Sequence, residues 1–95
     1  MLVKLGVDIS RLKRETRRVL PIIEYIYWKH ASEEAVITST YEGNHGSGSL
    51  HYANQAIDFR LSKKPIATEI FKNDLGAGFD IVLEKDHLHI EFDPK

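Results

Sequence analysis

The longest periodic pattern in the chain is an apolar stripe that repeats at helical spacing over residues 10–30. One face of the expected helix is apolar and the opposite face is charged, which is typical of a helix that covers a hydrophobic core. Pro21 lies inside this pattern and removes one helical hydrogen bond, so we expect a kinked helix or two abutting helices. Ser10 is the predicted N-cap. The apolar face consists of Leu12, Thr16, Val19, Leu20, Ile23, Ile26 and Tyr27.

Four shorter segments have the composition of β-strands. Residues 35–40 are rich in β-branched side chains and have polar residues on both sides. Residues 56–61, 79–83 and 87–92 are the other predicted strands, and the last two are expected to pair as a hairpin.

A second helix is predicted to run from Pro65 to about residue 73, with Pro65 in its first turn and Gly76 as its terminator. The resulting order is helix, strand, strand, helix, strand, strand. This order predicts an α+β fold in which the helices pack on a small antiparallel sheet.

The composition limits the classes of function. The 95 residues are enough for a single domain with one modest core, covering residues 1–95. A net charge of −1 gives no global electrostatic argument for nucleic acid or for stable membrane association. The chain has no cysteine, so a bound metal would be held by histidine and carboxylate. No signal peptide or transmembrane pattern is found, so we expect the protein to be made in the cytoplasm.

Two short segments contain the residues most typical of a catalytic metal site. His87 and His89 alternate with Leu88 in a predicted strand, so their side chains project to the same side. Asp58 lies in another strand, and a turn-like segment before it could bring His51 towards the same point. Two imidazoles and one carboxylate, with an open fourth position, are a ligand set of catalytic zinc. On spacing alone, a metal site and histidines without a ligand role both stay open.

A glycine-rich loop over residues 42–49 leads to His51. Nothing in this loop can pack a core, and loops of this kind commonly form the rim of a substrate site. His45 lies within the loop and is either an exposed side chain or a substrate contact.

The two segments resemble the motifs of a known peptidase family. The first reads Ser49-x-His51-x-x-Asn54-x-Ala56-x-Asp58, and the second reads Asp86-x-x-His89 with His87 in between. They are similar to the paired motifs of the D-alanyl-D-alanine carboxypeptidase family of zinc metallopeptidases, which shares its fold with the Hedgehog signalling domain. The resemblance spans residues 36–93, and residues 86–93 look especially like small phage-encoded members.

This resemblance implies a role for each matched residue. The implied roles are zinc ligand for His51, Asp58 and His89, general base for Asp86, oxyanion stabilisation for His87, and orientation of a zinc ligand for Ser49. Ser49 is also a candidate substrate contact.

The predicted role of Asp86 depends on where the last strand begins. In a regular strand Asp86 would point away from His87 and His89, so the role requires Asp86 to precede the strand. Glu84 and Glu91 are the alternatives for the base.

The chain departs from the family motif at two positions. Asn54 replaces a glycine, which is tolerable because asparagine enters the left-handed region of backbone conformation more readily than most residues. Glu42 stands near the place where many members have an arginine that binds substrate, and an acid cannot bind a terminal carboxylate. Arg60 is the candidate to supply the missing positive charge.

The resemblance predicts a zinc-dependent hydrolase of amide bonds in bacterial peptidoglycan stem peptides. The activity would be that of an endopeptidase, or of a D,D- or L,D-carboxypeptidase, in a phage lysis or wall-penetration enzyme that is released from the cell or carried in a virion. The alternatives are a non-catalytic module that zinc stabilises and a metal-free interaction domain.

Overall fold

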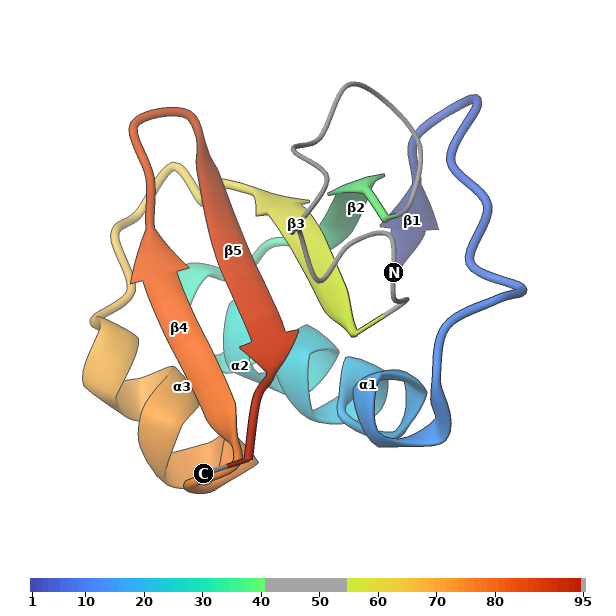
Figure 1. Ribbon diagram of the computed structural model, residues 1–95. Helices are drawn as coiled ribbons and strands as arrows, with labels where there is room; N and C mark the ends of the chain where they lie inside the picture. Colours follow the sequence, from blue (N-terminus) through green and yellow to red (C-terminus); the bar gives the residue numbers. More distant parts are fainter. Residues whose placement is uncertain (41–54, 95) are drawn as a thin grey trace.

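The computed structural model describes residues 1–40 and 55–94 of the chain. In chain order, its elements are β1 (Leu2–Val3), α1 (Arg14–Arg18), α2 (Leu20–Ala31), β2 (Val36–Ser39), β3 (Ala56–Arg60), α3 (Thr68–Leu75), β4 (Phe79–Leu83) and β5 (His87–Phe92). The predicted α+β fold class is confirmed (Figure 1). None of the helices in the described ranges is both long enough and apolar enough to span a membrane.

The strands form a mixed five-stranded sheet in the order β1-β2-β3-β5-β4. β2, β3, β5 and β4 pair antiparallel, including the predicted β4–β5 hairpin, whereas β1 runs parallel to β2. The expectation of a purely antiparallel sheet therefore missed the edge strand. β1 has two residues, which is too short to produce a recognisable alternation of apolar and polar residues.

Helices α2 and α3 pack on one face of this sheet (Figure 1). Side chains alternate between the two faces along a strand, so every second residue of β3, β4 and β5 points towards the helices. The core is formed by these residues and the apolar faces of the helices: Ile23, Ile26, Tyr27, Ile37, Ile57, Phe59, Phe71, Leu75, Phe79, Ile81, Leu88 and Ile90. The other side chains of β3 and β5 are turned to the opposite face, which has no helix in the described ranges.

The first amphipathic segment forms two helices, as the position of Pro21 allows. Val19 is both the C-cap of α1 and the N-cap of α2, and Pro21 lies in the first turn of α2. Proline is tolerated there because the first helical N–H groups have no partner within the helix. The prediction of Ser10 as N-cap is wrong. Its backbone N–H donates to Asp8 Oδ1 over 2.8 Å in a turn. The N-cap position of α1 is held by Lys13, which makes no capping hydrogen bond with its side chain.

The second predicted helix is shifted along the chain. It begins at Thr68 and not at Pro65, and Ser62 Oγ donates to the Lys64 carbonyl over 2.6 Å in the connection before it. Gly76 ends the helix, as predicted, with a φ of 95° that few other residues adopt at low cost.

The register between β2 and β3 contains an irregularity close to Asp58. Ile37 is opposite Phe59, but Ser39 is opposite Asp58, so β2 has one extra residue, Thr38. This is the geometry of a β-bulge, which bends a strand locally. Thr38 Oγ1 donates to the Asp58 carbonyl over 3.3 Å, so the bulge also holds the backbone at this position.

Thr16 provides a test of the core. Its side chain is fully buried, and Oγ1 has no hydrogen-bond partner among the described residues. We expect Thr16→Val to raise the free energy of unfolding by about 1 kcal/mol, because the substitution keeps the shape and removes an unpaired buried hydroxyl. Urea denaturation measures the change. Thr16→Ser is the control and should destabilise the protein. If Thr16→Val destabilises the protein as much as Thr16→Ser does, the prediction is wrong and Oγ1 has a hydrogen-bond partner in solution.

Candidate metal site

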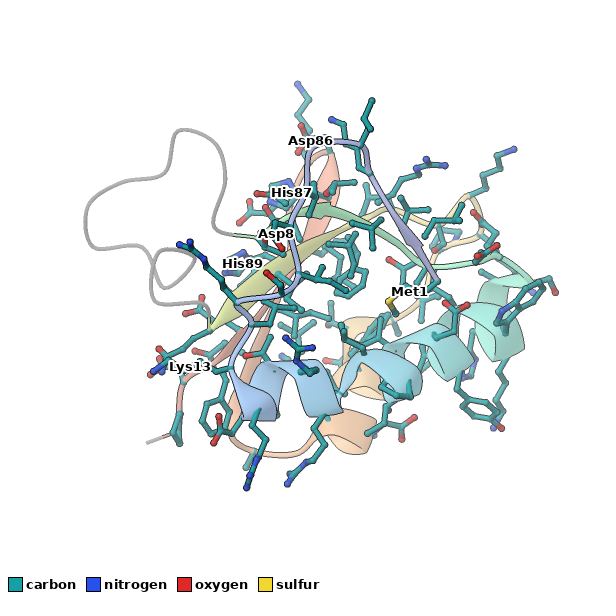
Figure 2. The ribbon with its side chains drawn as sticks, turned by 90° about the vertical axis from the view of Figure 1, so that its right-hand side faces the viewer. Met1, Asp8, Lys13, Asp86, His87 and His89 are labelled. Atoms are coloured by element: carbon teal, nitrogen blue, oxygen red, sulfur yellow. The ribbon has the colours of Figure 1, made fainter. Side chains whose placement is uncertain are left out.

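The pairing of β3 with β5 brings together residues that are about thirty positions apart in the sequence. Asp58 is opposite His89, and Arg60 is opposite His87. Residues directly opposite each other in an antiparallel pair project to the same face. Leu88 and Ile90 point into the core, so His87 and His89 point to the opposite face of the sheet. Figure 2 shows Asp86, His87 and His89 in succession along this part of the chain.

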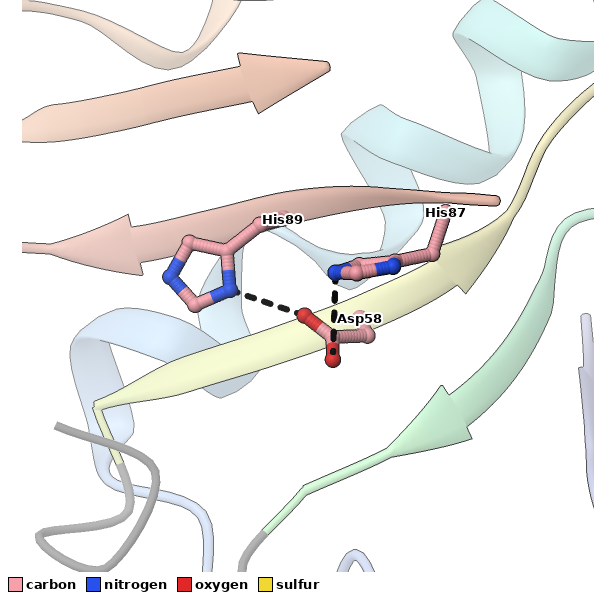
Figure 3. Close-up of side chains that lie close together, drawn as sticks. All are labelled: Asp58, His87 and His89. Carbon is pink, nitrogen blue, oxygen red and sulfur yellow. Dashed lines mark hydrogen bonds and ion pairs between the residues drawn. The ribbon is translucent and has the colours of Figure 1, made fainter. Parts of the chain in front are cut away.

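Asp58 lies between the two histidines (Figure 3). Its Oδ1 is 2.8 Å from His89 Nδ1, and its Oδ2 is 3.7 Å from His87 Nε2. One possible ligand atom from each of the three residues lies within 4.8 Å of the other two. The side chains are 12%, 31% and 18% exposed for Asp58, His87 and His89, so the group is largely buried but still in contact with solvent.

Each histidine also contacts a carboxylate through its second ring nitrogen. His87 Nδ1 is 2.6 Å from Asp86 Oδ1, and His89 Nε2 is 2.8 Å from Glu91 Oε1. These two outer carboxylates differ in exposure. The side chain of Asp86 is 86% exposed, whereas that of Glu91 is 21% exposed. The contact to Glu91 is therefore the better shielded of the two.

The two carboxylates beside His89 raise its pKa above the ordinary value of 6.5. The hydrogen bond to Asp58 is the main cause, burial opposes it, and the hydrogen bond to Glu91 adds to the increase. Hydrogen bonds from both ring nitrogens to ionised carboxylates favour the imidazolium form of His89 in the metal-free protein. In that form the ring partly offsets the charge of Asp58.

The donor set of Asp58, His87 and His89 fits a divalent metal ion. One carboxylate oxygen and two imidazole nitrogens suit zinc, and they also suit other divalent transition metals. Histidine ligands in proteins commonly donate their second N–H to a carboxylate, as His87 and His89 can do here. The residues described by the structure therefore hold a group that can bind a metal ion.

Two of the three predicted zinc ligands lie in the part of the chain that the structure describes, and they are close together. Asp58 and His89 are adjacent, while His51, His45 and Ser49 lie outside the described residues. His87, predicted as an oxyanion donor, belongs to the same group of possible ligands.

The other predicted site residues lie next to this group. Asp86 precedes β5, as its predicted role required, and its carboxylate contacts His87. Arg60 is exposed at the end of β3, opposite His87, and its carbonyl accepts a hydrogen bond of 2.7 Å from the Tyr27 hydroxyl.

Glu91 is the residue whose contact the sequence analysis missed. The sequence indicates Glu91 only as an alternative base, but its carboxylate contacts the ring of His89. The spacing His89-x-Glu91 was a usable signal, because residues two apart in a strand project to the same face. Glu91 also belongs to a group of carboxylates with Asp80 and Asp93, whose oxygens lie within 4.8 Å of one another.

The raised pKa of His89 predicts a pH dependence of stability in the metal-free protein. The imidazolium contributes stability that is fully present below the unfolded-state pKa of about 6.5 and is lost as the pH rises through the higher folded-state pKa. Urea unfolding in the presence of a chelator measures this between about pH 5 and pH 9. The stability difference between the natural protein and His89→Gln should shrink as the pH rises. A difference that grows over this range would contradict the assignment.

Metal binding predicts an increase in thermal stability. A ligand at about 100 times its dissociation constant stabilises the folded state by about 2.7 kcal/mol. For a chain of this size, this corresponds to a rise in Tm of roughly ten degrees or more. We expect zinc to raise the Tm of the natural protein and to have little effect on Asp58→Asn. Each variant is compared with itself in chelator, so a loss of intrinsic stability does not affect the result.

Comparison of the chain with protein-family models, with curated proteins and with solved structures gives no match. The peptidase resemblance therefore rests on the motif residues themselves.

Proposed function

We propose that this protein is a zinc-dependent peptidase that hydrolyses an amide bond in the stem peptides of bacterial peptidoglycan. The observation that carries the proposal is the convergence of Asp58, His87 and His89 on one face of the sheet, with Asp86 bonded to His87. These residues come from the two segments that resemble the peptidase motifs. In this proposal Asp58 and His89 bind the ion, together with His51 as the motif implies.

A divalent ion at this position would supply Lewis acidity that activates water and polarises the amide carbonyl. The remaining steps belong to the side chains of the protein. Asp86 is the proposed base, which takes a proton from the attacking water and later transfers it to the leaving amine. Its exposed carboxylate has one oxygen bonded to His87 and is accessible to a substrate that approaches from solvent.

The proton on His87 Nε2 decides what this residue does. If Asp86 accepts the Nδ1 proton of a neutral ring, Nε2 has a lone pair and can bind a metal. If the ring is an imidazolium, Nε2 carries a proton and can donate to the oxygen of the amide as negative charge develops on it. The motif implies the donor role, in which His87 stabilises the oxyanion.

Arg60 and the residues of the loop that precedes His51 are the proposed substrate contacts. The guanidinium group of Arg60 is the cation next to His87 in the paired strands, so it can bind a carboxylate of the stem peptide. The proposed setting is phage lysis or wall penetration, in which the protein is released from the cell or carried in a virion.

The activity test uses purified peptidoglycan and mass analysis of the released fragments, which also identifies the bond that is cleaved. We expect Asp58→Ala to lose both zinc and activity. Asp86→Asn should keep zinc and lower kcat by about 10² to 10⁴, the usual contribution of general acid–base catalysis. Glu69→Gln, on the exposed side of α3, is the control and should match the natural protein.

The same assay shows whether His87 is a hydrogen-bond donor or a metal ligand. It also distinguishes a peptidase from a zinc-stabilised binding module. His87→Ala should bind zinc almost normally and lose kcat if His87 is a donor, but should lose zinc affinity if it is a ligand. A protein that binds zinc and cleaves no peptidoglycan would instead be a zinc-stabilised binding module. Full activity of Asp86→Asn would overturn the assignment of the base.

A further inference from the structure

The ring of His89 is held from both sides by carboxylates. Asp58 Oδ1 contacts Nδ1 and Glu91 Oε1 contacts Nε2, and both distances are 2.8 Å. A histidine that binds a metal uses one nitrogen for the ion, and the partner of the other nitrogen fixes the tautomer and the ring orientation. The contacts of His89 therefore indicate which nitrogen is left for a metal.

Nδ1 is the nitrogen that faces the candidate site. It is turned towards Asp58, whose other oxygen faces His87 Nε2, so the three possible ligand atoms are on the Nδ1 side of the ring. Glu91 lies at the opposite nitrogen. Its oxygen is therefore the natural acceptor for the Nε2 proton and is not part of the Asp58, His87 and His89 group.

The surroundings of Glu91 make it a well-defined partner. Glu91 is opposite Ala56 in β3 and opposite Asp80 in β4, so it lies in an interior strand of the sheet. The next residue, Phe92, donates its backbone N–H to the Gln55 carbonyl over 2.8 Å, which ties this end of β5 to the start of β3. The position of the Glu91 backbone is thus fixed on both sides.

The chemistry of Glu91 also suits acceptance of an N–H group. Its ionised carboxylate can only accept, and one of its oxygens is 2.8 Å from His89 Nε2. A carboxylate that accepts the N–H of a ligand histidine makes the opposite ring nitrogen a stronger donor to a metal ion. The side chain of Glu91 is 21% exposed, whereas that of Asp86, which contacts His87, is 86% exposed and is therefore less shielded from solvent.

We propose that Glu91 is the positioning residue of the metal site: it holds the Nε2 proton of His89 and thereby makes Nδ1 the metal-binding atom. This inference rests on the metal-binding part of the proposed function and is independent of whether the protein cleaves peptides. It assigns to Glu91 a role other than that of general base.

The first experiment compares the zinc affinity of the natural protein with that of Glu91→Gln, by competition with a chromophoric chelator. Glutamine has nearly the same shape and can still accept the Nε2 proton through its amide oxygen, but it lacks the charge. We expect an affinity about 10 to 100 times lower for Glu91→Gln, the usual effect of losing an outer partner of a ligand histidine. Glu69→Gln is the matched control and should bind zinc as the natural protein does.

The second experiment reads the coordinating nitrogen directly in the natural protein. NMR of isotope-labelled histidine in the cadmium-loaded protein should show coupling between the metal and His89 Nδ1, with a proton on Nε2. This measurement needs no variant, so it tests the proposal even if Glu91→Gln fails to fold.

The outcomes separate this inference from the proposed function. Coupling of the metal to Nε2, or a zinc affinity of Glu91→Gln within about twofold of the natural protein, would overturn the role of Glu91 and leave the metal site intact. A natural protein that binds neither zinc nor cadmium would overturn both. A metal site that behaves as expected but supports no peptide hydrolysis would leave the role of Glu91 in place and remove only the peptidase.

Discussion

The antiparallel pairing of β3 with β5 is the interaction on which the site depends. This register sets Asp58 opposite His89 while Ile57 and Ile90 enter the core. A shift of one residue would turn the polar side chains into the core and the apolar ones to the other face. The hydrophobic effect that packs Ile57 and Ile90 against the helices therefore also holds the carboxylate and the imidazole together. The stability of the core and the geometry of the site are consequences of the same register.

The second constraint is the charge of Asp58, whose side chain is only 12% exposed. A buried carboxylate needs a compensating charge or hydrogen bonds. In the metal-free protein His89 contacts Asp58 through one ring nitrogen and Glu91 through the other, and the raised pKa of His89 favours its charged form. A bound cation would take over this compensation and release the Nδ1 proton, so metal binding and protonation of His89 compete.

Most of the elements were predictable because the signals for them are local. The apolar faces of α1 and α2, the break near Pro21, the β4–β5 hairpin and the end of α3 at Gly76 follow from periodicity, proline and glycine. The start of α3 and the cap of α1 were misplaced, because turns such as the one at Ser10 compete with helix formation through contacts that no periodicity reports. The parallel strand β1 was missed because its two residues are too few to show the alternation of a strand.

For the site, the sequence by itself determined which residues have the chemistry to bind a metal and, through alternation, that His87 and His89 share a face. Only the tertiary structure decided that Asp58 lies between their rings and that Glu91 occupies the second nitrogen of His89. The physical reason is that side-chain direction within a strand follows from a local repeat of two residues. The choice of neighbouring strand and of its register follows from the burial of the whole core, to which residues throughout the chain contribute.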